Sequence, residues 1–144
     1  MAHTDADHYA AKHTLDRPLN KNIAAAVKQS VAEDGIACAD AAAISRRLGV
    51  AMQEVGVTID LLEMRIKWCQ LGLFGFDRQM GILQPANEVA PDLEIAIREN
   101  LVEGRLPCVA AWEIAERKRI PRMDVASVCE KLKIRIKPCQ LGAF

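Results

Sequence analysis

The chain has 144 residues, of which half are apolar and only 4% aromatic, and it carries 19 basic and 19 acidic residues. This composition predicts a core of Ala, Val, Ile and Leu. The balanced charge excludes a strong attraction to polyanions over the whole surface.

The first 20 residues form no apolar segment, which excludes a typical secretory signal. They hold all three histidines at irregular spacing, so we expect a flexible arm rather than a metal site. The longer apolar stretches that follow are broken by charge, so we expect no membrane span. The expected location is therefore cytoplasmic, with the five cysteines reduced.

After this arm the chain repeats itself, because residues 23–74 align without a gap with residues 93–144. Both copies end in Ile-Lys-x-Cys-Gln-Leu-Gly-x-Phe. Such a repeat indicates one structural unit present twice. Units this small are marginal alone, so we expect the copies to pack on each other or on another chain. The predicted organisation is a flexible arm (1–20), a first repeat (21–76), a linker (77–90) and a second repeat (91–144).

Each copy is predicted to contain three helices. The first is amphipathic, with Asn22 and Asp92 as expected N-caps, and a brief extended stretch separates it from the second. Gly49 suits the end of the second helix, and Pro121 can open the last helix. The expected helices span 23–31, 40–48 and 52–63 in the first copy, and 93–101, 110–118 and 122–133 in the second.

Each copy is also predicted to end in a short strand, since apolar and basic residues alternate over 64–69 and 134–137. A Gln-Leu-Gly turn follows, and Phe74 and Phe144 are expected to anchor the ends in the core. The expected fold is mainly α, a tandem repeat of three-helix units, each with a short C-terminal β-strand.

The second and third helices of each copy resemble the helix-turn-helix of bacterial transcription regulators. The apolar places of that motif hold Ile44, Leu48, Val50 and Val55 in the first copy and Ile114, Ile120, Val125 and Val128 in the second. Its small residue corresponds to Ser45 or Ala115, and Gly49 stands at the turn. Lys118 and Arg119 depart from the pattern. The following strand is similar to the winged-helix variant.

The resemblance implies a non-enzymatic, DNA-binding transcription regulator whose third helix enters the major groove. The exposed places of that helix in the first copy would be Ala51, Met52, Gln53, Gly56, Val57 and Asp60. The candidate contacts to double-stranded DNA are Arg46, Arg47, Gln53, Arg65, Lys67, Arg117, Lys118, Arg119, Arg122, Ser127, Arg135 and Lys137.

Two other interpretations remain open. Met52, Val57 and Met123 would suit a protein partner, which makes a protein–protein interaction (assembly) module, or a homodimer, the main alternative. The repeated pairs Cys38/Cys108 and Cys69/Cys139 could serve a metal or redox sensor, although without C-x-x-C spacing they are as consistent with packing. The sequence contains no phosphate loop or nucleophile elbow, and it indicates no cofactor and no metal.

Overall fold

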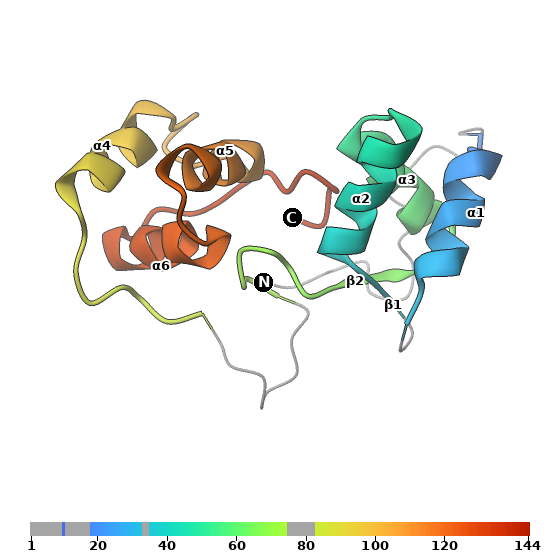
Figure 1. The fold of residues 1–144 in the computed structure, drawn as a ribbon, viewed down its shortest axis with the longest axis horizontal. Coiled ribbons are helices and arrows are strands. Elements are labelled where there is room, and N and C mark those ends of the chain that lie inside the picture. Colours follow the sequence, from blue (N-terminus) through green and yellow to red (C-terminus); the bar gives the residue numbers. More distant parts are fainter. Residues whose placement is uncertain (1–9, 11–17, 33–34, 75–82) are drawn as a thin grey trace. The chain divides into compact units, whose positions relative to one another are not determined.

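The computed structural model describes residues 10, 18–32, 35–74 and 83–144, and over these residues the chain is mainly helical with one small two-stranded sheet (Figure 1). Most of the predicted arm and part of the predicted linker therefore lie outside the described residues. The chain divides into two compact units. Unit 1 comprises the described residues up to Cys69 together with Leu141–Ala143, and unit 2 comprises those of Gln70–Gln140 together with Phe144.

Unit 1 contains three helices and both strands. The helices are α1 (Lys21–Ser30), α2 (Cys38–Leu48) and α3 (Met52–Leu61). The strands β1 (Gly35–Ala37) and β2 (Arg65–Lys67) pair in parallel. The strand predicted in the first copy is thus present, although it is shorter than expected.

The N-terminus of α1 is fixed by Asn20, whose Oδ1 accepts hydrogen bonds from the backbone N–H groups of Asn22 and Ile23, both at 3.0 Å. Asn22 was the predicted N-cap, and that prediction was wrong because the apolar pattern does not reveal the polar first turn that precedes it. The cap satisfies two N–H groups that the helix itself leaves without partners.

A tight turn joins α2 to α3. Gly49 adopts the left-handed conformation, with φ 66°, which a glycine accepts without a steric penalty. The Ser45 hydroxyl donates to the Val50 carbonyl at 2.6 Å, and the Val50 N–H donates back to the Ser45 carbonyl at 3.1 Å. These bonds hold the angle between the two helices.

The core of unit 1 is aliphatic, as the composition predicts. Each helix contributes one row of buried apolar side chains. Ile36 of β1 is fully buried where it pairs with Ile66 of β2. The largest fully buried side chains of the unit are Ile23, Val27, Ile36, Ile44, Val55, Ile59 and Leu141.

Unit 2 contains α4 (Pro91–Glu99), α5 (Cys108–Lys118) and α6 (Arg122–Leu132). Pro91 opens α4 after Ala90, so Asp92 lies in the first turn. The prediction that Asp92 is the N-cap was wrong. A proline is favoured there because its missing N–H would have no helical partner. Among the fully buried side chains of this unit are Leu71, Ile97, Leu106, Ile114 and Val125.

The turn between α5 and α6 uses a different residue for the same backbone shape. Arg119 adopts the left-handed conformation, with φ 56°, and its N–H donates to the carbonyls of Ala115 and Glu116. A tight turn between two helices is therefore formed at the position where the sequence departs from the motif.

The strand predicted at the end of the second copy does not form. In the described part of unit 2 the corresponding segment makes only one isolated parallel bridge, between Leu106 and Ile136. The ladder ends there, because the next donor would be Cys139, and its N–H donates to the Phe144 carbonyl at 2.8 Å instead. Phe74 and Phe144, predicted as core anchors, are both only half-buried and pack edge to face, with ring centroids 5.7 Å apart.

None of the helices in the described ranges is long and apolar enough to cross a bilayer.

Candidate functional site

Three of the predicted DNA contacts in unit 1 lie exposed on its helices. Arg46 and Arg47 occupy the last turn of α2, and Gln53 lies in the first turn of α3. Cations in a last helical turn complement the negative end of the helix dipole, so Arg46 and Arg47 also have an ordinary structural role.

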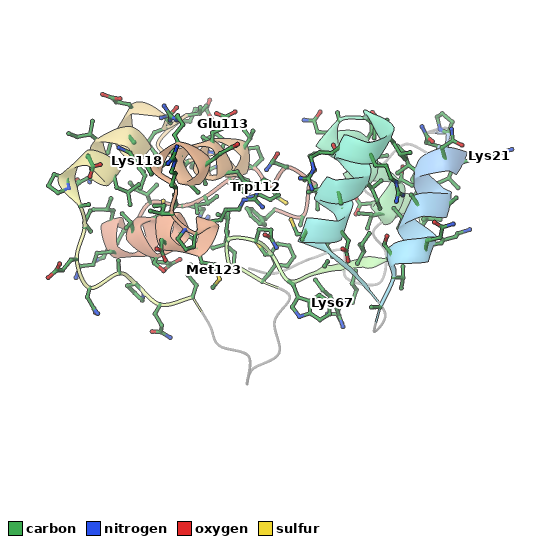
Figure 2. All side chains as sticks on the ribbon, viewed as in Figure 1. Lys21, Lys67, Trp112, Glu113, Lys118 and Met123 are labelled. Atoms are coloured by element: carbon green, nitrogen blue, oxygen red, sulfur yellow. The ribbon has the colours of Figure 1, made fainter. Side chains whose placement is uncertain are left out.

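The basic residues predicted on the strands differ in exposure. Arg65 is exposed, whereas Lys67 is half-buried, with its Nζ 5.6 Å from the ring centroid of Trp68 (Figure 2). In unit 2, Arg135 and Lys137 are both exposed on either side of the bridged position.

The basic run at the end of α5 is exposed but partly neutralised. Arg117, Lys118 and Arg119 all lie at the surface. Lys118 Nζ donates to Asp92 Oδ2 at 3.0 Å, and this hydrogen bond, together with the attraction between the charges, lowers the pKa of Asp92 below its ordinary value. The carboxylate thus offsets part of the positive field at this turn.

Arg122, one of the predicted DNA contacts, is engaged within unit 2. Its guanidinium carbon lies 3.6 Å from the ring centroid of Trp112 on α5, and its Nη1 donates to Gln70 Oε1 at 3.2 Å. An arginine stacked on an aromatic ring and hydrogen-bonded to an amide is held in place, and it gives up both interactions if it turns toward another partner.

Part of the exposed face predicted for α3 is covered. Gly56 is buried and Asp60 is only 5% exposed, so the prediction that both face solvent was wrong. The reason is the missing side chain at Gly56, because a Cβ there would overlap the carbonyl of Leu141. The backbone of the Leu141–Ala143 segment therefore packs directly on this helix, within unit 1.

The corresponding face of α6 is also in contact with other segments of its own unit. The side chain of Met123, on α6 (Figure 2), lies against Gly72. A Cβ added at Gly72 would be only 2.7 Å from Met123 Cε. The Ser127 carbonyl accepts a hydrogen bond from the Ala86 N–H at 3.0 Å, and the Ser127 side chain is half-buried. Ser127 is therefore less available to a base edge than the sequence suggested.

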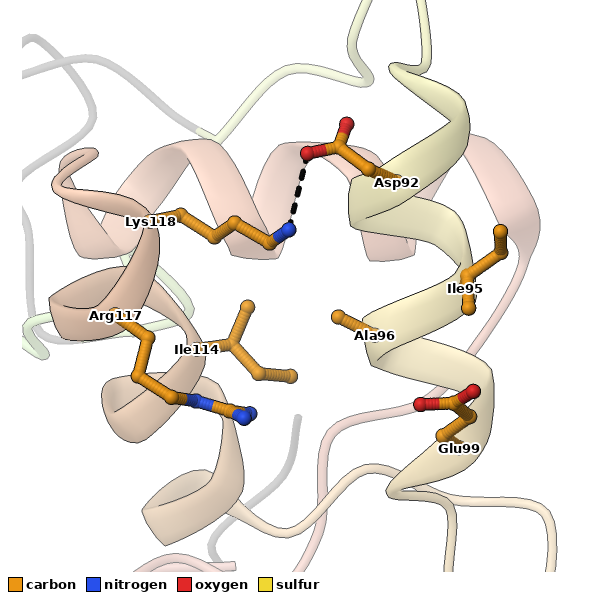
Figure 3. Close-up of a pocket in the computed structure, with 7 residues that line it drawn as sticks. All are labelled: Asp92, Ile95, Ala96, Glu99, Ile114, Arg117 and Lys118. Carbon is orange, nitrogen blue, oxygen red and sulfur yellow. Dashed lines mark hydrogen bonds and ion pairs between the residues drawn. The ribbon is translucent and has the colours of Figure 1, made fainter.

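A surface pocket of about 440 Å³ lies between α4 and α5 (Figure 3). Ala96 and Ile114 face each other across its floor, while Asp92 and Lys118 join at one end and Glu99 and Arg117 face each other at the other. Ile95 contributes to its α4 wall and is 57% exposed. The pocket combines an apolar floor with a rim of both charges.

Sequence reasoning missed this pocket, although one signal was present. Ile95 lies two residues after the buried Leu93 and so falls off the apolar stripe of α4. An isoleucine outside the stripe indicates an apolar side chain that the helix does not bury in its own unit.

The cysteines do not gather into a conventional metal site. Among the residues that the structure describes, no three His, Cys, Asp or Glu side chains are placed to hold a metal ion. Burial raises the pKa of Cys129 to about 12, with a smaller contribution from the charge of Glu130, so this thiol is unreactive.

A comparison of the chain with protein-family models, with curated proteins and with solved structures gave no match.

Proposed function

We propose that the chain is a non-enzymatic protein-interaction module built from two helix-turn-helix-like units, and that unit 2 binds its partner at the pocket between α4 and α5. The left-handed residues Gly49 and Arg119 at the two turns support the helix-turn-helix assignment. The small residues Ser45 and Ala115, at equivalent places before these turns, let the second and third helices of each unit approach closely.

The observation that carries this proposal is that other segments cover part of the third helix in each unit. In helix-turn-helix proteins that bind DNA, this helix presents side chains to base edges. Here Gly56 of α3 lies under Leu141, and in α6 Arg122 is stacked on Trp112 while Met123 covers Gly72. A third helix occupied in this way serves in part as a packing element, and Ile95 of α4, at 57% exposed, offers more free apolar surface than Met123, at 41%.

The pocket indicates the chemistry of the partner. Its apolar floor suits a leucine- or methionine-sized side chain, and its mixed rim suits flanking charges of both signs. An amphipathic helix of another protein meets both requirements, since it presents an apolar row bordered by charge. Asp92 and Glu99 would instead repel a phosphate backbone.

Site-specific photo-crosslinking in a native extract tests the proposal. A photoreactive residue at position 95 should capture a partner, whose purified form should then bind the full chain directly. Ile95→Asp should weaken that binding at least about tenfold, because a buried apolar contact is replaced by a charge. Val102→Asp is the matched control, since Val102 is equally exposed, at 59% against 57%, and lies outside the pocket. Equal affinities for both variants would refute the assignment.

DNA binding is the second candidate, because five basic residues are exposed near the ends of α2 and α5. They are Arg46, Arg47, Arg117, Lys118 and Arg119. If they form the interface, fluorescence anisotropy with a random duplex should show affinity falling on the order of a thousandfold between about 50 and 200 mM salt. Arg47→Glu with Arg117→Glu should abolish it. The protein-interaction proposal expects no duplex binding at physiological salt.

A further inference from the structure

Each unit has one cysteine at the N-terminus of its second helix and another on the segment that runs beside the residues before that helix. Cys38 and Cys108 are the first residues of α2 and α5. Cys69 follows β2, which pairs with β1 just before α2. Cys139 follows Ile136, which is bridged to Leu106 just before α5. The arrangement occurs twice, so it can be compared between the units.

Backbone hydrogen bonds define the register in unit 2. Leu106 N–H donates to the Arg135 carbonyl at 3.0 Å, and Lys137 N–H donates to the Leu106 carbonyl at 2.9 Å, which sets Leu106 opposite Ile136. Cys108 N–H then donates to the Pro138 carbonyl at 3.0 Å. This bond lies one residue beyond the position that a continued parallel ladder would give, and it places the peptide between Pro138 and Cys139 against Cys108.

This hydrogen bond brings the backbones of Cys108 and Cys139 close together. Paired backbones lie about 4.8 Å apart. A disulfide joins residues whose Cα atoms are about 4.4–6.8 Å apart. The backbones of Cys108 and Cys139 are therefore close enough for a disulfide to join these residues.

Two polar features lie beside the Cys108 sulfur. The N-terminal residue of a helix lies at the positive end of the dipole. Gln140 Nε2 also donates toward Cys108 Sγ at 3.6 Å, a contact that stabilises negative charge on the sulfur. Cys108 itself is buried, at 4% exposed, so it can react with a neighbouring sulfur more readily than with a solute.

Accessibility distinguishes the two pairs. Cys139 is partly exposed, whereas its counterpart Cys69 is only 5% exposed. Cys38 is buried too, at 6% exposed, so neither thiol of unit 1 is open to a solute.

We propose that Cys108 and Cys139 are a redox-active dithiol, which closes reversibly to a disulfide by exchange with small disulfides such as oxidised glutathione. The Cys139 thiolate attacks the glutathione disulfide, which forms a mixed disulfide and releases one glutathione. The Cys108 thiolate then attacks the Cys139 sulfur and releases the second glutathione. The protein loses two electrons and two thiol hydrogens, which end on the two glutathiones. This site is independent of the partner-binding pocket.

The test uses the full, reduced chain in mixtures of oxidised and reduced glutathione, quenched with acid, alkylated and mapped by mass spectrometry. A peptide linking Cys108 to Cys139 should grow with the oxidised fraction and disappear on return to reduced glutathione. Cys38, Cys69 and Cys129 should remain alkylated at the ratio where half of the Cys108–Cys139 pair is closed.

Variants separate the two steps. Cys108→Ser should accumulate the mixed glutathione disulfide at Cys139, because the resolving thiol is gone. Cys139→Ser should leave Cys108 reduced, and Cys69→Ser should behave as the wild type. Circular dichroism checks that each variant is folded.

The wild-type chain decides the proposal even if a variant fails to fold. Closure of the Cys108–Cys139 pair should be faster in the native chain than in urea. If both thiols stay alkylatable in the folded chain at the highest oxidised fraction, or if the link forms only in urea, the proposal is wrong.

Discussion

Gly56 shows how one missing side chain shapes unit 1. A glycine within a helix usually costs about 1 kcal/mol relative to alanine. Here the absence of a Cβ lets the Leu141 backbone lie directly on α3. A glycine therefore suits this helical position, because the Leu141 backbone fills the space that a side chain would need.

Substitution of Gly56 tests this contact through the sign of its effect. Gly56→Ala should destabilise the protein by about 1–3 kcal/mol, because the added methyl overlaps a backbone that cannot rotate away. The free energy of unfolding is measured by urea titration. Ala43→Gly, at an exposed position of α2, is the control, and it should cost about 1 kcal/mol from propensity alone. A stabilising Gly56→Ala would mean that α3 is open at this position.

Arg122 illustrates a residue whose role depends on neighbours distant in the sequence. Its position at the start of a predicted third helix suggested base reading. Its partners, Trp112 and Gln70, belong to other segments of unit 2, so no local pattern could have identified them. For the same reason Asp60 was expected at the surface and is buried.

At the scale of a single helix, α1 depends on its cap. Asn20→Ala should cost about 1 kcal/mol, because two N–H groups of the first turn lose their acceptor. Asn22→Ala is the matched control. Asn22 is exposed within α1, so its replacement by a better helix former should be neutral or slightly stabilising. Urea titrations of both variants give the comparison, and equal losses would contradict the assignment of Asn20 as the cap.

The turns after α2 and α5 allow a reciprocal experiment. Arg119 holds a left-handed conformation that costs a non-glycine residue about 1 kcal/mol or more, whereas Gly49 holds the same conformation freely. Arg119→Gly should therefore raise the free energy of unfolding by up to about 1 kcal/mol, and Gly49→Ala should lower it by a similar amount. Thermal and urea unfolding report both. If Arg119→Gly destabilises, the arginine side chain makes a contact that outweighs the backbone strain.

For the whole molecule, the sequence predicted what is encoded locally. Helix periodicity and the turn at Gly49 placed the helices within a few residues, because both depend on neighbours within one or two turns. The exposed Ile95 and the α4–α5 pocket depend on how two helices meet, which periodicity does not specify.

The sequence could not predict in which unit the last segment of each repeat packs. Residues 66–74 and 136–144 share the pattern Ile-Lys-x-Cys-Gln-Leu-Gly-x-Phe, so either segment offers the same apolar residues to either unit. In the structure Leu71 belongs to unit 2 and Leu141 to unit 1, each with the helices of the other repeat. Chain connectivity and long-range packing decide this pairing, and neither can be read from the repeated pattern.

Paired substitutions test this exchange. Leu71 and Leu141 are both fully or almost fully buried, at 0% and 2% exposed. Leu→Ala at either site should cost about 2–5 kcal/mol. Hydrogen exchange followed by mass spectrometry should locate each loss. Leu141→Ala should raise the exchange of α3 amides in unit 1, and Leu71→Ala should raise that of α6 amides in unit 2. If Leu71→Ala instead loosened α3 and left α6 protected, each segment would be packing on the helices of its own repeat. Leu71 and Leu141 occupy equivalent places in the repeat. If each substitution loosens the helices of the other repeat, the terminal segments are exchanged between the two units.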